Sequence, residues 1–233
     1  MAKEFSELLA KKDNIVLLGE AGCGKSEIAL NLAAQNAGER EVHFFDMDQT
    51  KPLYRSRDAA EIMAAAGVSF HYERQFYDAP TLVGGVAESL NNPAQLTIMD
   101  VGGNDTGARL IGGFSKLLAG ENTIVFYVVN PYRPWSKSTE TIDVTLSSIL
   151  RVSHLKSFHI ISNPNLGGGT SLEEFAAGIE RTEEMLLQYV PVEGACVREE
   201  IFSGACQRTS LPLMRLHLYL TYEWNNNQEE NHG

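Results

Sequence analysis

The stretch GEAGCGKS, residues 19 to 26, has the residue types and spacing that could hold a polyphosphate. It fits the pattern G-x-x-x-x-G-K-[ST], with Gly19, Gly24, Lys25 and Ser26 at the fixed positions. Glycines let a loop wrap a phosphate so that successive backbone N–H groups point inward, and a following helix N-terminus adds partial positive charge. Lys25 would neutralise the β- and γ-phosphates of a nucleotide, and the Ser26 hydroxyl would bind Mg²⁺. The motif therefore predicts a nucleotide site with Mg²⁺ as cofactor.

The remaining residues of this loop are expected at the nucleotide as well, namely Gly22, Cys23 and Glu27. Cys23 lies between two glycines, so we expect its backbone to face phosphate while its side chain points elsewhere. A small, tolerated side chain is one interpretation of Cys23, and redox control through its thiol is the alternative.

Three aspartates follow two short apolar runs. Asp46 and Asp48 end the segment FFDMD, and Asp100 ends QLTIMD. Residues two apart on an extended chain share a face, so one of the first two acids could hold the metal shell while the other orients a water; a solvated loop is the alternative. Asp100 would meet the metal through water, and Gly102 and Gly103 would let the backbone approach the γ-phosphate. The predicted catalytic residues are Lys25 and Asp48, and the predicted metal residues are Ser26, Asp48 and Asp100.

Two further apolar runs end in Asn-Pro, within VVNPYRP and IISNPN. A GTPase would be expected to carry an Asn-Lys-x-Asp motif on such a strand, and Asn163-Pro164-Asn165 lacks both the Lys and the Asp. ATP is therefore favoured over GTP. The Asn163 amide offers a donor and an acceptor that could read adenine, and a simple Asn-Pro turn is the alternative.

Four arginines lie in or near these segments: Arg55, Arg57, Arg109 and Arg133. Guanidinium groups bind phosphates and carboxylates in a fork geometry, although a single surface arginine more often pairs with a neighbouring acid. Their number leads us to expect that one of them contacts nucleotide or a partner.

The elements that must position these residues alternate between short apolar runs and amphipathic stretches. The expected strands are 14–18, 42–45, 96–99, 123–129 and 158–161, and a helix is expected over 26–37. This alternation predicts an α/β fold in which helices flank a mostly parallel sheet, a P-loop NTPase. We expect residues 1–224 to form a single domain and the polar segment 225–233 to be disordered.

Composition narrows the function. The chain has 233 residues, 43% of them hydrophobic, and a formal net charge of −11 from 19 basic and 30 acidic residues. A phosphate backbone would be repelled by most of such a surface, which disfavours nucleic acid as a partner. The charged N-terminus and the absence of an apolar run of about 18 residues predict a cytoplasmic protein without membrane association. Three cysteines without a CxxC pair indicate free thiols.

Taken together, the motifs resemble the MinD/ParA-like branch of P-loop ATPases, which includes partition ATPases and CooC-like ATPases of metalloenzyme maturation. The blocks DMDQTKPLYRSRDA, DVGGNDTGARLIGGF, VVNPYRP and SNPNLGGGT look closest to a family of MinD-like ATP-binding proteins of anaerobic bacteria. The resemblance covers roughly residues 13–180, and residues 197–216 look more loosely like the final strand and adenine-contacting loop of this branch.

The resemblance implies ATP and Mg²⁺ as ligands and a role for three residues. Asp48 matches the aspartate that positions the attacking water, Asp100 the metal-linked aspartate, and Asn163 the adenine-reading Asn. The branch usually carries Lys at the second loop position, where it reaches across a dimer to the partner's phosphate, and this chain has Glu20 there. An acid cannot supply that charge, so a homodimer would have to be built another way.

We therefore expect a Mg·ATP-dependent ATPase whose ATP and ADP states differ in their affinity for a protein partner. Two other functions stay open. In a small-molecule or nucleotide kinase, Asp48 would be the base and Arg55 or Arg57 would clamp the acceptor. A nucleotide-gated scaffold would bind ATP without useful turnover.

Overall fold

The computed structural model describes residues 5–48, 56–72, 84–103 and 105–220. Within these ranges the chain forms one eight-stranded sheet in the order β3-β2-β4-β1-β5-β6-β7-β8, and every strand pair is parallel. The strands are β1 (Asn14–Leu18), β2 (Glu41–Met47), β3 (Val68–Tyr72), β4 (Gln95–Val101), β5 (Thr123–Val129), β6 (His159–Ser162), β7 (Val192–Arg198) and β8 (Leu213–Leu216). The predicted α/β fold with a parallel sheet is confirmed.

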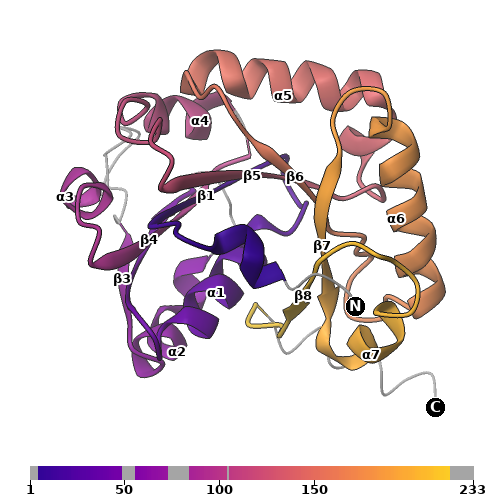
Figure 1. Ribbon diagram of the computed structural model, residues 1–233, viewed down its shortest axis with the longest axis horizontal. Coiled ribbons are helices and arrows are strands. Elements are labelled where there is room, and N and C mark those ends of the chain that lie inside the picture. Colours follow the sequence, from indigo (N-terminus) through magenta and orange to yellow (C-terminus); the bar gives the residue numbers. More distant parts are fainter. Residues whose placement is uncertain (1–4, 49–55, 73–83, 104, 221–233) are drawn as a thin grey trace.

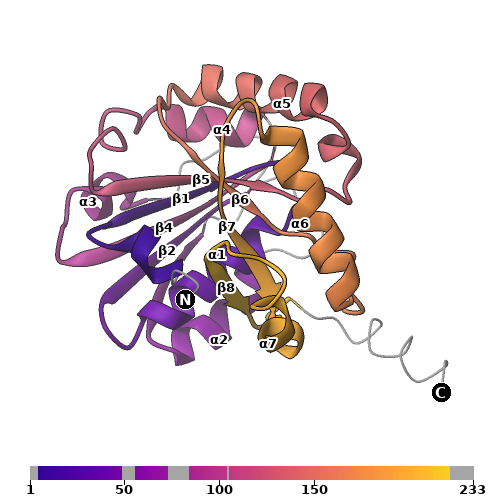
Figure 2. The same ribbon diagram turned by 45° about the vertical axis from the view of Figure 1, so that its right-hand side comes forward.

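Helices cover both faces of this sheet (Figure 1). One face carries α1 (Lys25–Asn36) and α2 (Ala60–Ala65), and the other carries α4 (Asp105–Gly112) and α5 (Thr139–Ser153). The remaining α-helices are α3 (Val86–Leu90), α6 (Leu172–Leu186) and α7 (Phe202–Ala205), and Figure 2 brings α6 forward together with β7 and β8. The short 3-10 turns are Phe5–Leu9, Ser56–Ala59, Pro134–Ser136 and Glu199–Ile201.

Alternate residues of the central strand supply the two halves of the core. Ile15 and Leu17 pack toward α1, whereas Val16 and Leu18 pack toward α4 and α5, and all four are at most 1% exposed. Burying each such side chain contributes about 1.5–3 kcal/mol to stability. Because both faces of β1 are buried, residues 15–18 form one continuous apolar run. β1 lies between β4 and β5, where the strand order reverses, and this is the position at which open parallel sheets bind ligands.

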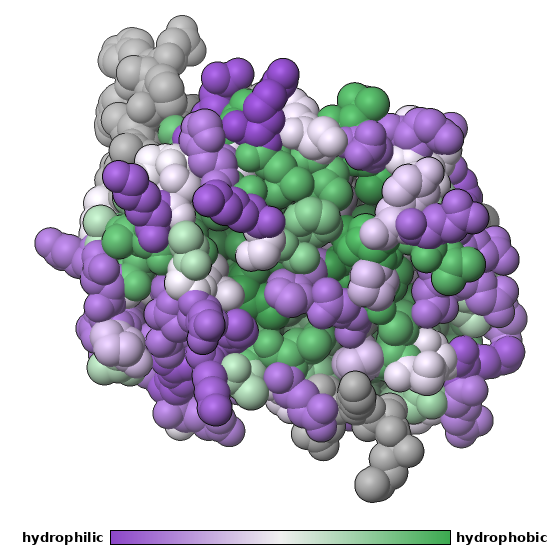
Figure 3. Space-filling model, turned by 45° about the horizontal axis from the view of Figure 1, so that its top comes forward, coloured by the Kyte–Doolittle hydropathy of each residue, from purple (hydrophilic) through white to green (hydrophobic). Residues whose placement is uncertain are grey.

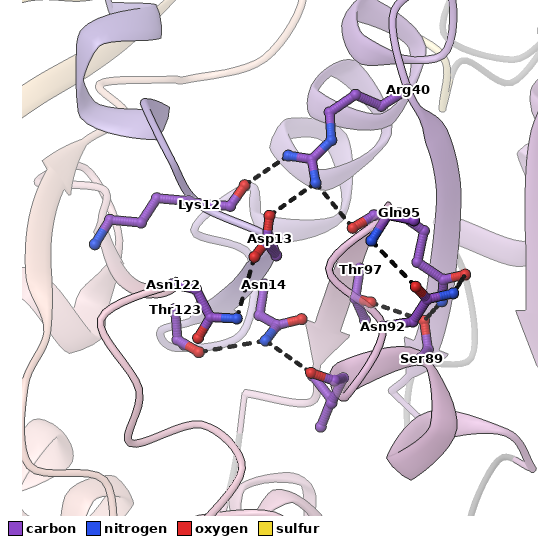
Figure 4. Close-up of polar contacts among 12 residues, drawn as sticks. Lys12, Asp13, Asn14, Arg40, Ser89, Asn92, Gln95, Thr97, Asn122 and Thr123 are labelled. Carbon is purple, nitrogen blue, oxygen red and sulfur yellow. Dashed lines mark hydrogen bonds and ion pairs between the residues drawn. The ribbon is translucent and has the colours of Figure 1, made fainter.

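A polar network fixes the amino ends of the central strands (Figure 4). The Arg40 guanidinium donates to the carbonyls of Lys12 (2.8 Å) and Gln95 (3.0 Å) and to the Asp13 carboxylate (2.8 Å). Asn122 donates to the other oxygen of Asp13 at 3.2 Å. The network joins the starts of β1, β4 and β5, and thereby helps to hold their opposite, carboxyl ends in register.

All five strands expected from apolar runs are present, with bounds that differ by at most two residues at either end. The edge strand β3 was not predicted, because VSFHY alternates polar and apolar residues and only Val68 is fully buried. A strand starting at Val192 was not predicted either, since VEGACVR carries a glycine and charged residues. The segment 225–233, predicted to be disordered, lies outside the described residues.

Figure 3 brings the α4 and α5 side of the molecule forward and shows hydrophobic residues near the centre of this face, with hydrophilic residues around them. Val144 of α5 is 70% exposed. Scattered exposed apolar residues are ordinary on a globular protein. No helix in the described part of the chain has both the length and the apolar character needed to cross a membrane.

Candidate nucleotide site

The loop between β1 and α1 has the backbone of a phosphate cradle. Gly19, Gly22 and Gly24 adopt φ values of 135°, 75° and 98°, which favour glycine. A Cβ at Gly24 would lie 2.2 Å from the Asn163 amide nitrogen, so no other residue fits there without displacing that side chain. α1 begins directly after Gly24, so its N-terminus points into the loop.

The side chains of Lys25 and Ser26 lie inside this loop, 1% and 3% exposed respectively. Lys25 Nζ donates to the carbonyl of Glu20 at 3.0 Å and approaches Cys23 Sγ at 3.9 Å. The Cys23 side chain is 1% exposed and belongs to the core on the α1 side of the sheet, as expected from its position between two glycines. A lysine held against the loop backbone has its ammonium group where it could meet a bound phosphate.

A glycine outside the loop, Gly103 just after the neighbouring strand β4, packs against the loop. Gly103 follows β4, and a Cβ there would lie 2.7 Å from the backbone nitrogen of Ala21. The backbone after β4 therefore packs directly against the tip of the phosphate loop. The expected approach of Gly103 to the nucleotide itself stays a prediction.

Asn163 joins the end of β6 to the loop. Its amide nitrogen donates to the carbonyl of Cys23 at 2.8 Å, and its side chain packs on Gly24. Asn163 is 2% exposed, and its backbone N–H donates to Val129 at the end of β5. The observed contacts make Asn163 a brace for the loop. Adenine recognition by the same amide stays a prediction.

A cavity of about 500 Å³ opens beside the loop, within the usual size range of ligand sites. The phosphate loop and the first turn of α1 line one part of it, with Ala21, Gly22, Gly24, Ser26 and Glu27. The rest of its wall comes from the ends of β5 and β6 and from the chain after β8, with Asn130, Arg133, Asn163, Asn165, Gly167, Gly168, Leu218 and Leu220. The backbone of the glycine loop and apolar side chains thus border one cavity, an arrangement that suits a nucleotide.

The three aspartates predicted from the strand ends are all buried, at 1% (Asp46), 3% (Asp48) and 0% (Asp100). Asp46 and Asp100 are register partners on β2 and β4. Arg57 donates through Nε to Asp46 at 2.7 Å and through Nη2 to the carbonyl of Asp48 at 3.0 Å. Burial, and then the Asp100 carboxylate, raise the pKa of Asp46 to about 6, although Arg57 acts in the opposite direction.

Asp46 and Asp48 therefore have different surroundings. Asp46 accepts the backbone N–H of Asp48 (3.0 Å) and holds Arg57, which makes it a structural member of the site. Asp48 lies against the turn after β4, where its Oδ1 is 3.2 Å from the position of a Cβ on Gly102. The sequence did not separate these two roles, because both acids fit the same alternation.

Asp100 fits a metal-linked role. One of its oxygens accepts the Ser56 hydroxyl at 2.8 Å, and the other, Oδ1, is buried with no hydrogen-bond partner among the described residues. A buried carboxylate oxygen is costly unless something polar reaches it, and a hydrated cation would do so. No three His, Cys, Asp or Glu side chains in the described ranges could hold a metal ion by themselves. Mg²⁺ at this site would therefore depend on water and nucleotide phosphates for most of its ligands.

The C-terminal segment, residues 215–220, docks on α1. Three side chains of α1, spaced four residues apart, bond to its backbone. Glu27 accepts the backbone N–H groups of Tyr219 (2.5 Å) and Leu220 (3.2 Å), Asn31 bonds both backbone groups of His217, and Gln35 donates to Arg215. Burial raises the pKa of Glu27, and the two backbone hydrogen bonds lower it. Glu27 also lines the cavity, so its expected nucleotide contact stays a prediction.

The sequence did not identify α1 as the surface on which this segment docks. The signal for this docking was the polar series at 27, 31 and 35, which forms one stripe on an otherwise apolar helix. The docking bears directly on the site, because Leu218 and Leu220 of this segment line the cavity.

The arginines expected near the site have different surroundings in the structure. Arg57 holds the aspartates, Arg109 is exposed on α4, and Arg133 reaches the phosphate loop, where its Nε donates to the carbonyl of Gly22 at 3.0 Å. Arg55 lies outside the described residues.

The comparisons with known proteins bear on the fold. No protein-family model matches the chain, and no curated protein matches it. Solved structures do match. The signal recognition particle receptor FtsY from Elizabethkingia anophelis in complex with GDP has a TM-score of 0.50 and 19% identity, over 80% of this chain and 57% of that chain. The chain has the fold of a P-loop NTPase.

Two further structures agree. Cell division protein FtsY from Thermotoga maritima has a TM-score of 0.52 and 14% identity, over 80% of this chain and 62% of that one. The signal recognition particle 54 kDa protein from Aeropyrum pernix K1 in complex with GDP has a TM-score of 0.50 and 18% identity, over 79% and 41%. The chain spans less than two thirds of the length of each of these proteins. At such identities the likeness shows the fold alone.

Proposed function

We propose that this P-loop protein is a Mg·ATP-dependent nucleotide switch of the MinD/ParA-like branch, which hydrolyses ATP slowly and changes its grip on a protein partner. The observation that carries this proposal is the glycine loop with inward Lys25, braced by Asn163 and bordering a nucleotide-sized cavity. The resemblance of the DMDQ, DVGG and SNPN blocks supports the branch.

The residues have separate roles in the proposed reaction. Mg²⁺, when bound, would neutralise charge on the β- and γ-phosphates. Lys25 and the backbone of the loop hold the triphosphate, while Ser26 and Asp100 are the groups that would meet the metal. Asp48, on the side of Gly102, orients the attacking water. Asp46 and Arg57 fix the position of Asp48 through its backbone.

ATP is proposed as the nucleotide because the segment after β6 lacks the Lys and Asp of a guanine-reading motif. The alternative is GTP, which the two GDP-bound structural neighbours favour. A titration of ATP against GTP on one preparation separates the two. Tighter binding of GTP than of ATP would overturn the nucleotide assignment without affecting the loop assignment.

The experiment for the switch is a partner capture with Asp48→Ala protein loaded with ATP, ADP or no nucleotide. The ATP-loaded variant should retain a partner that the ADP-loaded and nucleotide-free proteins release, because hydrolysis is blocked while the triphosphate is held. Identical recovered proteins in all three states would contradict the switch.

The same preparation tests the other two functions. Transfer of the γ-phosphoryl group to a small-molecule or nucleotide acceptor would indicate a kinase. ATP binding without release of phosphate by the wild-type protein would indicate a scaffold. A second copy of the chain stays a candidate partner, and light scattering with ATP and with ADP measures it.

A further inference from the structure

Arg133 combines two features that the proposed mechanism does not use: a direct bond to the phosphate loop and a position in the cavity wall. Its Nε donates to the carbonyl of Gly22 at 3.0 Å. A Cβ on Gly22 would lie 3.7 Å from this Nε and 3.9 Å from Cδ, so the side-chain stem lies flat against the loop. Gly22 and Arg133 are 111 residues apart, and the contact exists because β1 and β5 are neighbours in the sheet.

The backbone that carries Arg133 is held in place. Arg133 donates its N–H to the carbonyl of Asn130 (3.0 Å), and its own carbonyl accepts from Ser136 (3.0 Å). Asn130 is 1% exposed and donates to the carbonyl of Asn165 at 2.8 Å. A side chain on such a loop loses little conformational entropy when it binds a ligand.

The charge of Arg133 is uncompensated within the described part of the chain. Arg40, Arg57, Arg198, Arg208 and Arg215 each have a carboxylate within 4 Å, whereas no carboxylate pairs with Arg133 among the described residues. Arg109, Arg151 and Arg181 also have no carboxylate partner among the described residues, but unlike Arg133 they do not line the cavity. A guanidinium has five N–H donors, and Nε uses one of them on Gly22, which leaves the terminal fork for a ligand.

We propose that Arg133 binds the phosphates of the nucleotide and acts as a second cation beside Lys25. The inference rests on the proposed nucleotide binding and adds the residue that grips the polyphosphate from the β5 side. The Nε bond to Gly22 orients the guanidinium, and its Nη groups form charge-assisted hydrogen bonds to phosphate oxygens. Arg133 and Ser26 line the same cavity, so one polyphosphate can reach both.

The test measures the affinity of nucleotide-free protein for Mg·ATP and Mg·ADP by calorimetry at several salt concentrations. The variants are Arg133→Gln and Arg133→Lys, and Arg208→Gln is the matched control, because it makes the same charge change at an exposed arginine that does not line the cavity. Arg133→Gln should weaken ATP binding by about 10- to 100-fold, as expected for a hydrogen bond to a charged group. The ATP affinity of Arg133→Lys should lie between those of Arg133→Gln and wild type. The ATP affinity of Arg208→Gln should stay within about twofold of wild type.

A merely structural Arg133 would not change the salt dependence of binding. The slope of log Kd against log salt should decrease in Arg133→Gln and stay unchanged in Arg208→Gln, with the melting temperature of both variants near that of wild type. If wild type binds ATP and Arg133→Gln binds it within twofold, the role of Arg133 is refuted while nucleotide binding stands. If wild type binds no nucleotide, both proposals fail.

Discussion

Asn163 donates a hydrogen bond of 2.8 Å to the carbonyl of Cys23, and so joins the end of β6 to the middle of the phosphate loop. The bond lies next to Gly24, whose φ of 98° and close contact with the same amide leave no room for a side chain. A residue expected to read the base therefore also shapes the loop that we propose holds the phosphates.

Asn163→Asp replaces the donor with a carboxylate that would face the Cys23 carbonyl. We expect nucleotide affinity to fall by about 5- to 150-fold, since a lost buried hydrogen bond costs about 1–3 kcal/mol. Titration with ATP and GTP distinguishes the two roles of the residue. Equal losses for both nucleotides indicate a brace only, and a selective loss of ATP indicates that Asn163 also reads adenine. Unchanged affinity for both would contradict both roles.

Asn31→Ala tests the docking of the C-terminal segment. Asn31 is 2% exposed and bonds both the N–H and the C=O of His217 at 2.8 Å. Truncation leaves two backbone groups unpaired, so the free energy of unfolding in urea should fall by about 1–3 kcal/mol. Asn36→Ala is the control on the same helix, because among the described residues the Asn36 amide donates to the carbonyl of Leu32 within α1 and to no other segment. A loss no larger than that of the control would show that the docking contributes nothing to stability.

Asp48→Asn should separate binding from hydrolysis. The amide keeps the size of the side chain but cannot orient a water as a carboxylate does, so the rate of phosphate release should fall by about 100-fold or more. Affinity for ATP should change by less than about threefold, because Lys25 and the loop backbone hold the phosphates. Asp143→Asn, on the exposed side of α5, is the control. Hydrolysis at the wild-type rate in Asp48→Asn would remove Asp48 from the mechanism.

Much of this site could be predicted from the sequence, because the phosphate loop and the strand-end aspartates are local patterns. Lys25, Ser26 and Asp100 follow from motifs that each lie within a few residues. The contacts of Asn163 with Cys23 and of Asn31 with His217 could not be predicted, since they join segments 140 and 186 residues apart. Such contacts depend on strand order, which the alternation of apolar runs leaves open. The edge strand β3 was not predicted for a related reason, because a half-exposed strand lacks the continuous apolar run of a central strand.

The stability of the fold should depend on pH through two histidines on β2 and β3. His43 Nδ1 and His71 Nε2 are 3.0 Å apart, and a single proton between them leaves one of the two nitrogens as acceptor. Burial, and then the charge of His43, lower the pKa of His71. The unfolded chain therefore binds more protons than the folded chain just below pH 6.5, so this pair costs stability as the pH falls through that window.

Urea unfolding at pH 7.5 and pH 5.5 measures this effect. Wild type should lose more stability between the two pH values than His71→Gln, which removes the second imidazole. His154→Asn, at an exposed helix end, should behave like wild type. An equal or larger loss in His71→Gln would show that the pair does not carry the pH dependence.

The central claim is that the loop from Gly19 to Ser26 binds a nucleoside triphosphate, and calorimetric titration of nucleotide-free protein with Mg·ATP tests it most directly. Wild type should bind one ATP per chain, Lys25→Ala should bind at least about 100-fold more weakly, and Lys156→Ala, at an exposed lysine, should match wild type. The absence of binding to both ATP and GTP by wild-type protein, or equal binding by Lys25→Ala, would contradict the account.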